Sequence, residues 1–280
     1  MQDSAKDISQ KSKSSFYYTF NLLPSAKRDA MNTVYAFCRH TDDIIDEGSE
    51  DNNIKYEHLR KWRNELEKSF SGHSDYILLN KLANIIHRFN IPVEPFFELI
   101  KGVEMDLQKN RYNNIEDLLE YCYRVASTVG LMCIEIFGYN NKSTRNYAIN
   151  LGLALQLTNI LRDVKKDAQN NRIYLPMDDI QKFSYLESEL LNNTYNNNFI
   201  NLMSHESKIA KSYFEKADNE LRTEDKKSLF AARAMQHIYF RLLKKIERKN
   251  FDVFNKDINV SNFEKVFLAL GVWAKYRIVY

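Results

Sequence analysis

The stretch that decides the fold runs from Gly152 to Pro176 and reads Gly-Leu-Ala-Leu-Gln-Leu-Thr-Asn-Ile-Leu-Arg-Asp-Val-Lys-Lys-Asp-Ala-Gln-Asn-Asn-Arg-Ile-Tyr-Leu-Pro. Its apolar residues, among them Leu157 and Ile160, recur at helical spacing, so one face of a helix is apolar. The spacing predicts an amphipathic helix over residues 143–168. Polar side chains three or four positions apart share another face, which we call the downstream stripe. The downstream stripe consists of Gln156, Asn159, Asp163 and Asp167.

A second polar stripe lies on the helix predicted over residues 26–47. Its carboxylates crowd the end of that helix just before Gly48, where the helix dipole is negative and a cation is preferred. Each of the two helices therefore offers a pair of carboxylates one turn apart. We call the second set the upstream stripe, and it consists of Tyr35, Arg39, Asp42 and Asp46.

Oxygen ligands on two helices indicate a hard cation, and Mg²⁺ that also binds substrate phosphates fits them well. Zinc fits poorly, because no His-x-x-x-His pairing accompanies the stripes and no Cys-x-x-Cys occurs. A single Asp-x-x-x-Asp would be read as a solvated face, whereas two such pairs backed by Arg, Asn, Gln or Tyr favour a site. The predicted metal ligands are Asp42, Asp46, Asn159, Asp163 and Asp167, with Asp43 assisting.

The composition indicates one all-α domain. The 280 residues are 44% hydrophobic and include only seven Gly and four Pro, which is typical of a helical chain with few tight turns. We therefore predict a single-domain helical bundle around a central hydrophobic cavity, over residues 14–280, preceded by a flexible arm over residues 1–13. The net charge of +3 is mild, and Lys and Arg alternate with Asp and Glu, so no nucleic acid partner is expected.

The termini and cysteines bear on location. The first fifteen residues are polar and lack the apolar core of a signal peptide, and three Cys suit a reducing compartment. The longest apolar run, Val266 to Ala274, is half of the roughly 18 residues that a spanning helix needs. We expect a cytoplasmic protein without a transmembrane anchor. Its last helix, over residues 263–280, could cap the fold or contact the inner membrane surface as a peripheral protein.

Seven ordered motifs, spread over residues 14–255, resemble those of the squalene and phytoene synthases, the head-to-head branch of the isoprenoid synthases. The motifs are Ser15-Phe16-Tyr17-Tyr18, Leu22-Leu23-Pro24, Tyr35-Ala36-Phe37-Cys38-Arg39, Asp42 to Asp46, Tyr121-Cys122-Tyr123-Arg124-Val125-Ala126, Thr128-Val129-Gly130 and Gln156 to Pro176. The resemblance implies the all-α fold of isoprenoid synthases.

The resemblance also implies roles for individual residues. The four aspartates and Tyr121, with its hydroxyl near the reacting carbons, are expected to be catalytic. Expected diphosphate and substrate contacts are Ser15, Phe16, Tyr35, Arg39, Gln156, Asn159, Arg162, Arg172, Tyr174 and Tyr239. Expected cavity-lining residues are Phe20, Val125, Ala126, Val129 and Gly130.

The residues by themselves leave simpler roles open. Arg39 could form an intrahelical ion pair, and Arg172 could form a structural salt bridge. The small residues around Gly130, in a helix predicted over residues 115–139, could serve close helix packing. Glu104 and Asp106 are two apart and do not share a helix face, so we expect them at the surface or behind the metal site.

The implied reaction is Mg²⁺-dependent 1'-1 condensation of two farnesyl diphosphates to presqualene diphosphate, and on to squalene or dehydrosqualene. Residues 127–138 are most similar to bacterial enzymes of this kind. Phytoene synthase, which condenses two geranylgeranyl diphosphates, is the alternative. NADPH use stays open, because the family reduces its intermediate without a Gly-x-Gly-x-x-Gly motif. A non-catalytic helical scaffold is the alternative of another class, and the four intact aspartates disfavour it.

Overall fold

The computed structural model describes residues 19–46 and 51–278, and no strand occurs among them. The helices are α3 (Ser25–Asp46), α4 (Asn52–Ser69), α5 (Ile77–Phe89), α6 (Glu94–Gln108), α7 (Ile115–Cys122), η1 (Tyr123–Ser127), α8 (Thr128–Phe137), α9 (Thr144–Gln169), α10 (Met177–Lys182), α11 (Glu187–Leu191), α12 (Asn197–Glu220), η2 (Thr223–Asp225), α13 (Phe230–Arg248) and α14 (Asn262–Ile278). Buried apolar side chains from Phe20 to Val260 form one continuous core, which confirms the all-α bundle. The predicted arm, residues 1–13, lies outside the described residues.

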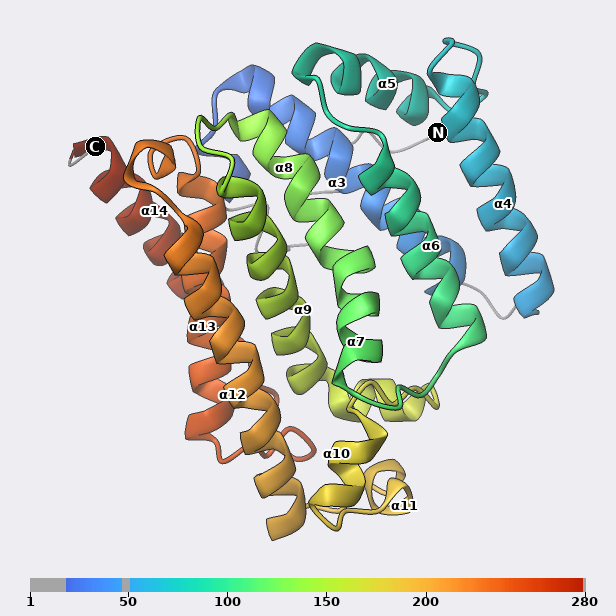
Figure 1. The fold of residues 1–280 in the computed structure, drawn as a ribbon, viewed down its shortest axis with the longest axis vertical. Helices are drawn as coiled ribbons and strands as arrows, with labels where there is room; N and C mark the ends of the chain where they lie inside the picture. The colour runs from blue at the N-terminus through green and yellow to red at the C-terminus, as the bar shows by residue number, and fades with distance from the viewer. Residues whose placement is uncertain (1–18, 47–50, 279–280) are drawn as a thin grey trace.

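Helix α9 is the centre of the bundle. Figure 1 shows it between α8 and α12, and it also packs against η1 and α13. Its predicted apolar positions, including Leu157, Ile160 and Val164, are buried. Buried residues elsewhere on α9, such as Tyr147 and Gly152, contact the other neighbours. This packing leaves one line of α9, the downstream stripe, for polar side chains.

The end of α9 turns the chain sharply back. Asn171 has a positive φ of 56°, and its N–H donates to the Ala168 carbonyl at 2.9 Å. The N–H of Arg172 donates to the Asp167 carbonyl, also at 2.9 Å, which completes a Schellman motif. Arg172 is thereby held beside the last turn of α9, next to the final carboxylate of the downstream stripe.

The predicted single helix over residues 115–139 is interrupted. Tyr123–Ser127 forms a π-helical turn, η1, between α7 and α8. Two glycines lie against this wider turn: a Cβ on Gly102 of α6 would lie 2.7 Å from Arg124 Cβ, and one on Gly152 of α9 would lie 2.5 Å from Ser127 Cα. The prediction of a regular α-helix was wrong here, because contacts with distant glycines favour a wider turn that local periodicity does not report.

Two short helices and the last helix complete the fold. Helix α10 was not predicted, and the short helix α11 follows it in a polar, Asn-rich segment. Helix α14 packs on α13 through Ala269, Val272 and Tyr276, and leaves Phe263 and Phe267 exposed. Within the described ranges, no helix has both the length and the apolar character needed to cross a bilayer.

The contact between α9 and η1 generates a stability prediction. Gly152→Ala should lower the free energy of unfolding by about 1–3 kcal/mol, because the added methyl would press on the Ser127 backbone, which cannot rotate away. Gly271→Ala on the exposed face of α14 is the matched control; it meets nothing within 4 Å and should stabilise by about 0.5–1 kcal/mol. Urea unfolding measures both. Equal effects of the two substitutions would contradict the tight contact.

Candidate active site

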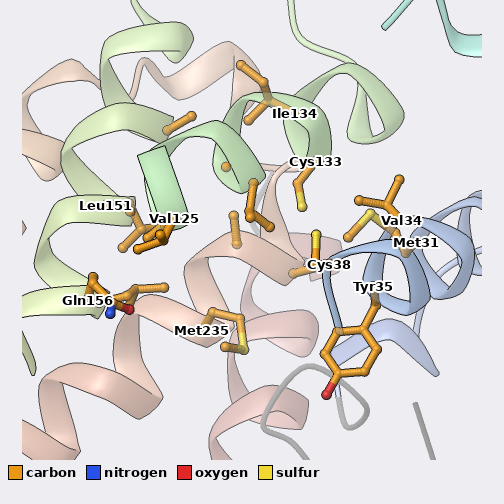
Figure 2. Close-up of a pocket in the computed structure, with 18 of the residues that line it drawn as sticks. Met31, Val34, Tyr35, Cys38, Val125, Cys133, Ile134, Leu151, Gln156 and Met235 are labelled. Atoms are coloured by element: carbon orange, nitrogen blue, oxygen red, sulfur yellow. The ribbon is translucent and has the colours of Figure 1, made fainter. Parts of the chain in front are cut away.

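An apolar cavity of about 250 Å³ lies between α3, α8, α9 and α13. Figure 2 shows Met31, Val34 and Cys38 of α3 facing Cys133 and Ile134 of α8. The five residues predicted to line a cavity all line this one: Phe20, Val125, Ala126, Val129 and Gly130. Close helix packing, the simpler role of the small residues, is present as well, since a Cβ on Gly130 would lie 2.8 Å from the Ala148 carbonyl oxygen.

Polar residues from both stripes line the same cavity. They come from α3, α9 and α13, so three helices supply its polar side. These residues are Tyr35, Arg39, Asp42, Gln156, Asn159 and Tyr239. Ser15 and Phe16, predicted at the mouth of the diphosphate site, lie outside the described residues.

Within the upstream stripe, Arg39 forms the intrahelical ion pair that its spacing allows, with Asp43 at 2.5 Å. Asp42 faces the cavity and Asp46 is exposed. Burial, and then the negative charge of Asp46, raises the pKa of Asp42 to about 7. The carboxylate nearest the cavity is therefore costly to charge when no cation accompanies it.

Within the downstream stripe, Arg162 holds Asp163 with two hydrogen bonds of 2.9 and 2.6 Å. Burial, followed by the charge of Asp163, raises the pKa of Asp167 to about 7. Asn159 Oδ1 is buried and finds no hydrogen-bond partner in the described part of the chain. An unpaired amide oxygen beside carboxylates suits a hard cation, so these residues fit Mg²⁺.

Arg172 connects the two stripes. Its Nη1 donates to Asp46 Oδ1 at 3.3 Å, which joins the turn after α9 to the end of α3. The structural salt bridge that the sequence allowed for Arg172 is therefore present, and it links the turn after α9 to the upstream stripe.

Asp106 of α6, expected at the surface or behind the metal site, takes the second of these places. Tyr121 and Tyr174 donate their hydroxyls to its two oxygens at 2.9 and 2.8 Å, and its charge acts on both Asp42 and Asp167. Asp106 therefore lies between the stripes rather than at the surface. A signal was available: Asp106 follows the buried Leu99 and Val103 by seven and three positions, so it shares their inward face.

Tyr121 and Tyr174 belong to a cluster of three tyrosines beneath the carboxylates. Their ring centroids are 5.1 Å apart, and Tyr112 lies 5.5 Å from Tyr121 and 5.6 Å from Tyr174. Tyr121 is not among the described residues that line the cavity, and its place at the reacting carbons stays a prediction. In the structure, the Tyr121 hydroxyl donates a hydrogen bond to Asp106.

Lys265 of α14 is a residue that the sequence analysis missed. Burial, and then the positive charge of Arg162, lowers the pKa of Lys265. Because the charge of Arg162 is felt at Lys265, Lys265 is an additional cation in the surroundings of the downstream stripe. Tyr239 of α13 is subject to the charges of Arg162, Asp163 and Tyr35, so it lies between the two stripes, as its predicted role requires.

The raised pKa values predict how stability depends on pH in metal-free protein. Because the folded pKa of Asp42 and Asp167 is about 7 and the unfolded value is about 4, the folded state keeps protons that the unfolded state has released between these values. The free energy of unfolding should therefore fall as pH rises from about 4 to about 7. Urea unfolding in EDTA measures it, and added Mg²⁺ should restore stability above that range.

Asp42→Asn should make this fall shallower, because an amide carries no charge to bury, while Asp167 keeps its share of the slope. Asp29→Asn, at an exposed position of the same helix, is the control and should keep the wild-type profile. A wild-type profile that rises with pH in EDTA would contradict the burial of these charges.

Comparison with known proteins identifies the family. The family model described as squalene/phytoene synthase matches residues 9–264. The chain is 34% identical over 276 residues to a 15-cis-phytoene synthase of Synechococcus elongatus, covering 94% of this chain and 89% of that protein. It is 36% identical over 264 residues to a phytoene synthase of Arthrospira platensis, with coverage of 90% and 85%.

Among solved structures, that of a dehydrosqualene synthase in complex with ligand superposes with a TM-score of 0.84 at 30% identity, covering 99% of this chain and 96% of that one. Members of this family are prenyltransferases with an all-α fold, and both properties agree with the described helices and cavity. The chain therefore belongs to the squalene/phytoene synthase family, as its seven motifs predict.

Proposed function

We propose that this chain condenses two molecules of geranylgeranyl diphosphate head to head, as a phytoene synthase. Head-to-head condensation of prenyl diphosphates is the activity of the family, and the C20 substrate is supported by the names of the relatives at 34% and 36% identity. The farnesyl reading, our first expectation, is supported less well. It stays the second candidate because the dehydrosqualene synthase structure is 30% identical over nearly the whole chain.

One observation carries the proposal: an apolar cavity opens beside two acidic stripes that Arg172 joins. Prenyl chains would lie in the cavity, and their diphosphates at the stripes. Asp42 and Asp46 would hold one group of Mg²⁺ ions, and Asn159, Asp163 and Asp167 another. Bound Mg²⁺ would neutralise the leaving diphosphate. Diphosphate oxygens would bridge the ions.

Cationic side chains around the stripes would position the diphosphates. Arg39, Arg162 and Arg172 are each paired with an aspartate, and a diphosphate would offer these guanidiniums further oxygens. Lys265, whose pKa is lowered by burial and by the charge of Arg162, would gain a counter-charge from a bound diphosphate. The apolar lining would exclude water, which would otherwise quench an allylic cation.

The tyrosine cluster would keep a polar group fixed beside the reaction. The Tyr121 and Tyr174 hydroxyls each hold their proton toward Asp106, so the orientation of the carboxylate is set by two donors. We expect Tyr35, Gln156 and Tyr239 to contact substrate from the cavity side, and Ser15 and Phe16 to contribute from the segment before α3.

Two finer points of the proposal concern the product. A C40 hydrocarbon leaves most readily into a lipid phase, and the exposed Phe263 and Phe267 of α14 support a peripheral contact with a membrane surface. NADPH is not needed for phytoene, whereas the farnesyl alternative could use it. The two candidates therefore differ in cofactor as well as in chain length.

The deciding experiment is incubation of the purified full-length chain with Mg²⁺ and either geranylgeranyl or farnesyl diphosphate, with and without NADPH, followed by mass analysis of the product. A C40 hydrocarbon from geranylgeranyl diphosphate is expected. A C30 product from farnesyl diphosphate alone would establish the second candidate. Absence of diphosphate release from both substrates would favour the non-catalytic scaffold.

The bridge between the stripes generates a mutational prediction. Arg172→Gln should lower kcat/KM for the prenyl diphosphate by about 10- to 100-fold, the equivalent of about 1.5–3 kcal/mol for charge-assisted hydrogen bonds. Arg60→Gln, which removes an exposed pair with Glu57 on α4, is the matched control and should change nothing. Wild-type kinetics for Arg172→Gln would show that Arg172 serves only as a structural link.

A further inference from the structure

A second group of ligand atoms lies outside the cavity and both stripes. It consists of Asp179 on α10 and of His205 and Glu206 on α12, and one ligand atom from each residue lies within 4.8 Å of the others. Figure 1 shows α10 and α11 at the same end of the bundle as the beginning of α12. The group joins two elements that are more than twenty residues apart in the chain.

The contacts within the group hold its side chains in place. His205 Nε2 lies 3.2 Å from Asp179 Oδ1, and the imidazole packs on Phe183 with ring centroids 5.2 Å apart. Lys182 Nζ lies 3.2 Å from the same Asp179 oxygen and 3.4 Å from His205 Nε2. Its side chain is 56% exposed, so the ammonium can leave the group without unpacking the core.

Glu206 is the observation that points to a ligand. The residue is only 3% exposed, and its Oε1 finds no hydrogen-bond partner among the described residues. Asp179, at 7% exposure, is its nearest charged neighbour and has the same sign. Two buried carboxyl groups therefore lie side by side, and either a proton held between them or a metal ion is needed to relieve their repulsion.

We propose that Asp179, His205 and Glu206 bind a divalent transition-metal ion of the Zn²⁺ or Co²⁺ type. One imidazole nitrogen and two carboxylate oxygens suit such ions, whereas Mg²⁺ prefers oxygen ligands alone. The ion displaces the Lys182 ammonium and any proton that Glu206 and Asp179 hold between them, and it supplies the counter-charge of both carboxylates. This site is independent of the proposed Mg²⁺ chemistry at the two stripes.

The position of the site gives the ion a structural role. Helix α10 begins directly after the Ile173–Pro176 segment, which carries Tyr174. An ion that ties α10 to α12 fixes the far end of this segment, while the Schellman motif at Asn171 fixes its near end. The metal therefore acts as a cross-link that steadies the connection leading from α9, rather than as part of the reaction.

Co²⁺ alone is the probe, because its visible absorption reports an imidazole ligand and a low coordination number. The full-length protein is stripped with EDTA and titrated with Co²⁺ in excess Mg²⁺, which occupies oxygen-only sites. We expect one equivalent of Co²⁺ with visible bands. His205→Gln and Glu206→Gln should each weaken its binding by at least about tenfold. Lys182→Met should strengthen binding, because the competing ammonium is gone.

Two controls separate this site from other histidines and from the stripes. His87→Gln, at an exposed position of α5, and Asp163→Asn, in the downstream stripe, should both keep the bands. Zn²⁺ should raise the thermal midpoint of the wild type but not that of Glu206→Gln. Absence of Co²⁺ bands in the wild type, or bands that survive Glu206→Gln, would overturn the proposal and leave Lys182 as the counter-charge of Asp179.

Discussion

The constraint on which the structure depends is the placement of carboxylates at the edge of a cavity that must stay dry. Asp42 lines the cavity and Asp167 lies partly buried outside it, and burial raises the pKa of each to about 7. Arginines offset the cost of charging these two carboxyls only in part, since each of Arg39, Arg162 and Arg172 is bound to a carboxylate outside this pair. Under the proposed function, the site would become electrostatically balanced when cations and diphosphates bind together.

The connections between helices position this site as much as the helices do. The chain after α6 and the chain after α9 run together, with the Ile173 N–H donating to the Asn110 carbonyl and the Met177 N–H donating to the Tyr112 carbonyl. This pairing brings the tyrosine cluster under Asp106, while the turn at Asn171 directs Arg172 toward Asp46. A change in either connection would move a hydrogen-bond donor of the site without touching an aspartate.

The parts of the site that the sequence predicts are those carried by one helix. Each stripe follows the helical period, so its spacing is visible in the chain. The place of Asp106 was left open between the surface and the metal site, because its partners, Tyr121 and Tyr174, come from two other elements. The π turn was missed because the glycines against it, Gly102 and Gly152, are distant in sequence.

The sequence did not predict the group of Asp179, His205 and Glu206 for the same reason that it did not predict the partners of Asp106. His205 and Glu206 are adjacent in sequence and do not share a helix face, so periodicity does not connect them. Only the fold brings Asp179 to them. Sites assembled across elements therefore need a structure, even where the family and the fold class can be predicted from motifs.

The length of the prenyl substrate is the point on which the evidence divides: residues 127–138 favour the C15 substrate, whereas the names of the relatives favour the C20 substrate. The geometry of the cavity explains why neither is a strong guide. The motifs surround the diphosphate end, which C15 and C20 substrates share. The cavity extends away from that end: Met31 precedes Asp42 by eleven residues of α3, or about 16 Å. At the same far end, Lys27 donates to the Phe137 carbonyl and so fixes α8 against α3. Five further carbons are worth about 4 kcal/mol if the cavity can bury them. Under the proposed function, selectivity would depend on a few apolar side chains outside the seven motifs, Met31 and Phe137 among them, so a relative could change its substrate there while those motifs stay the same.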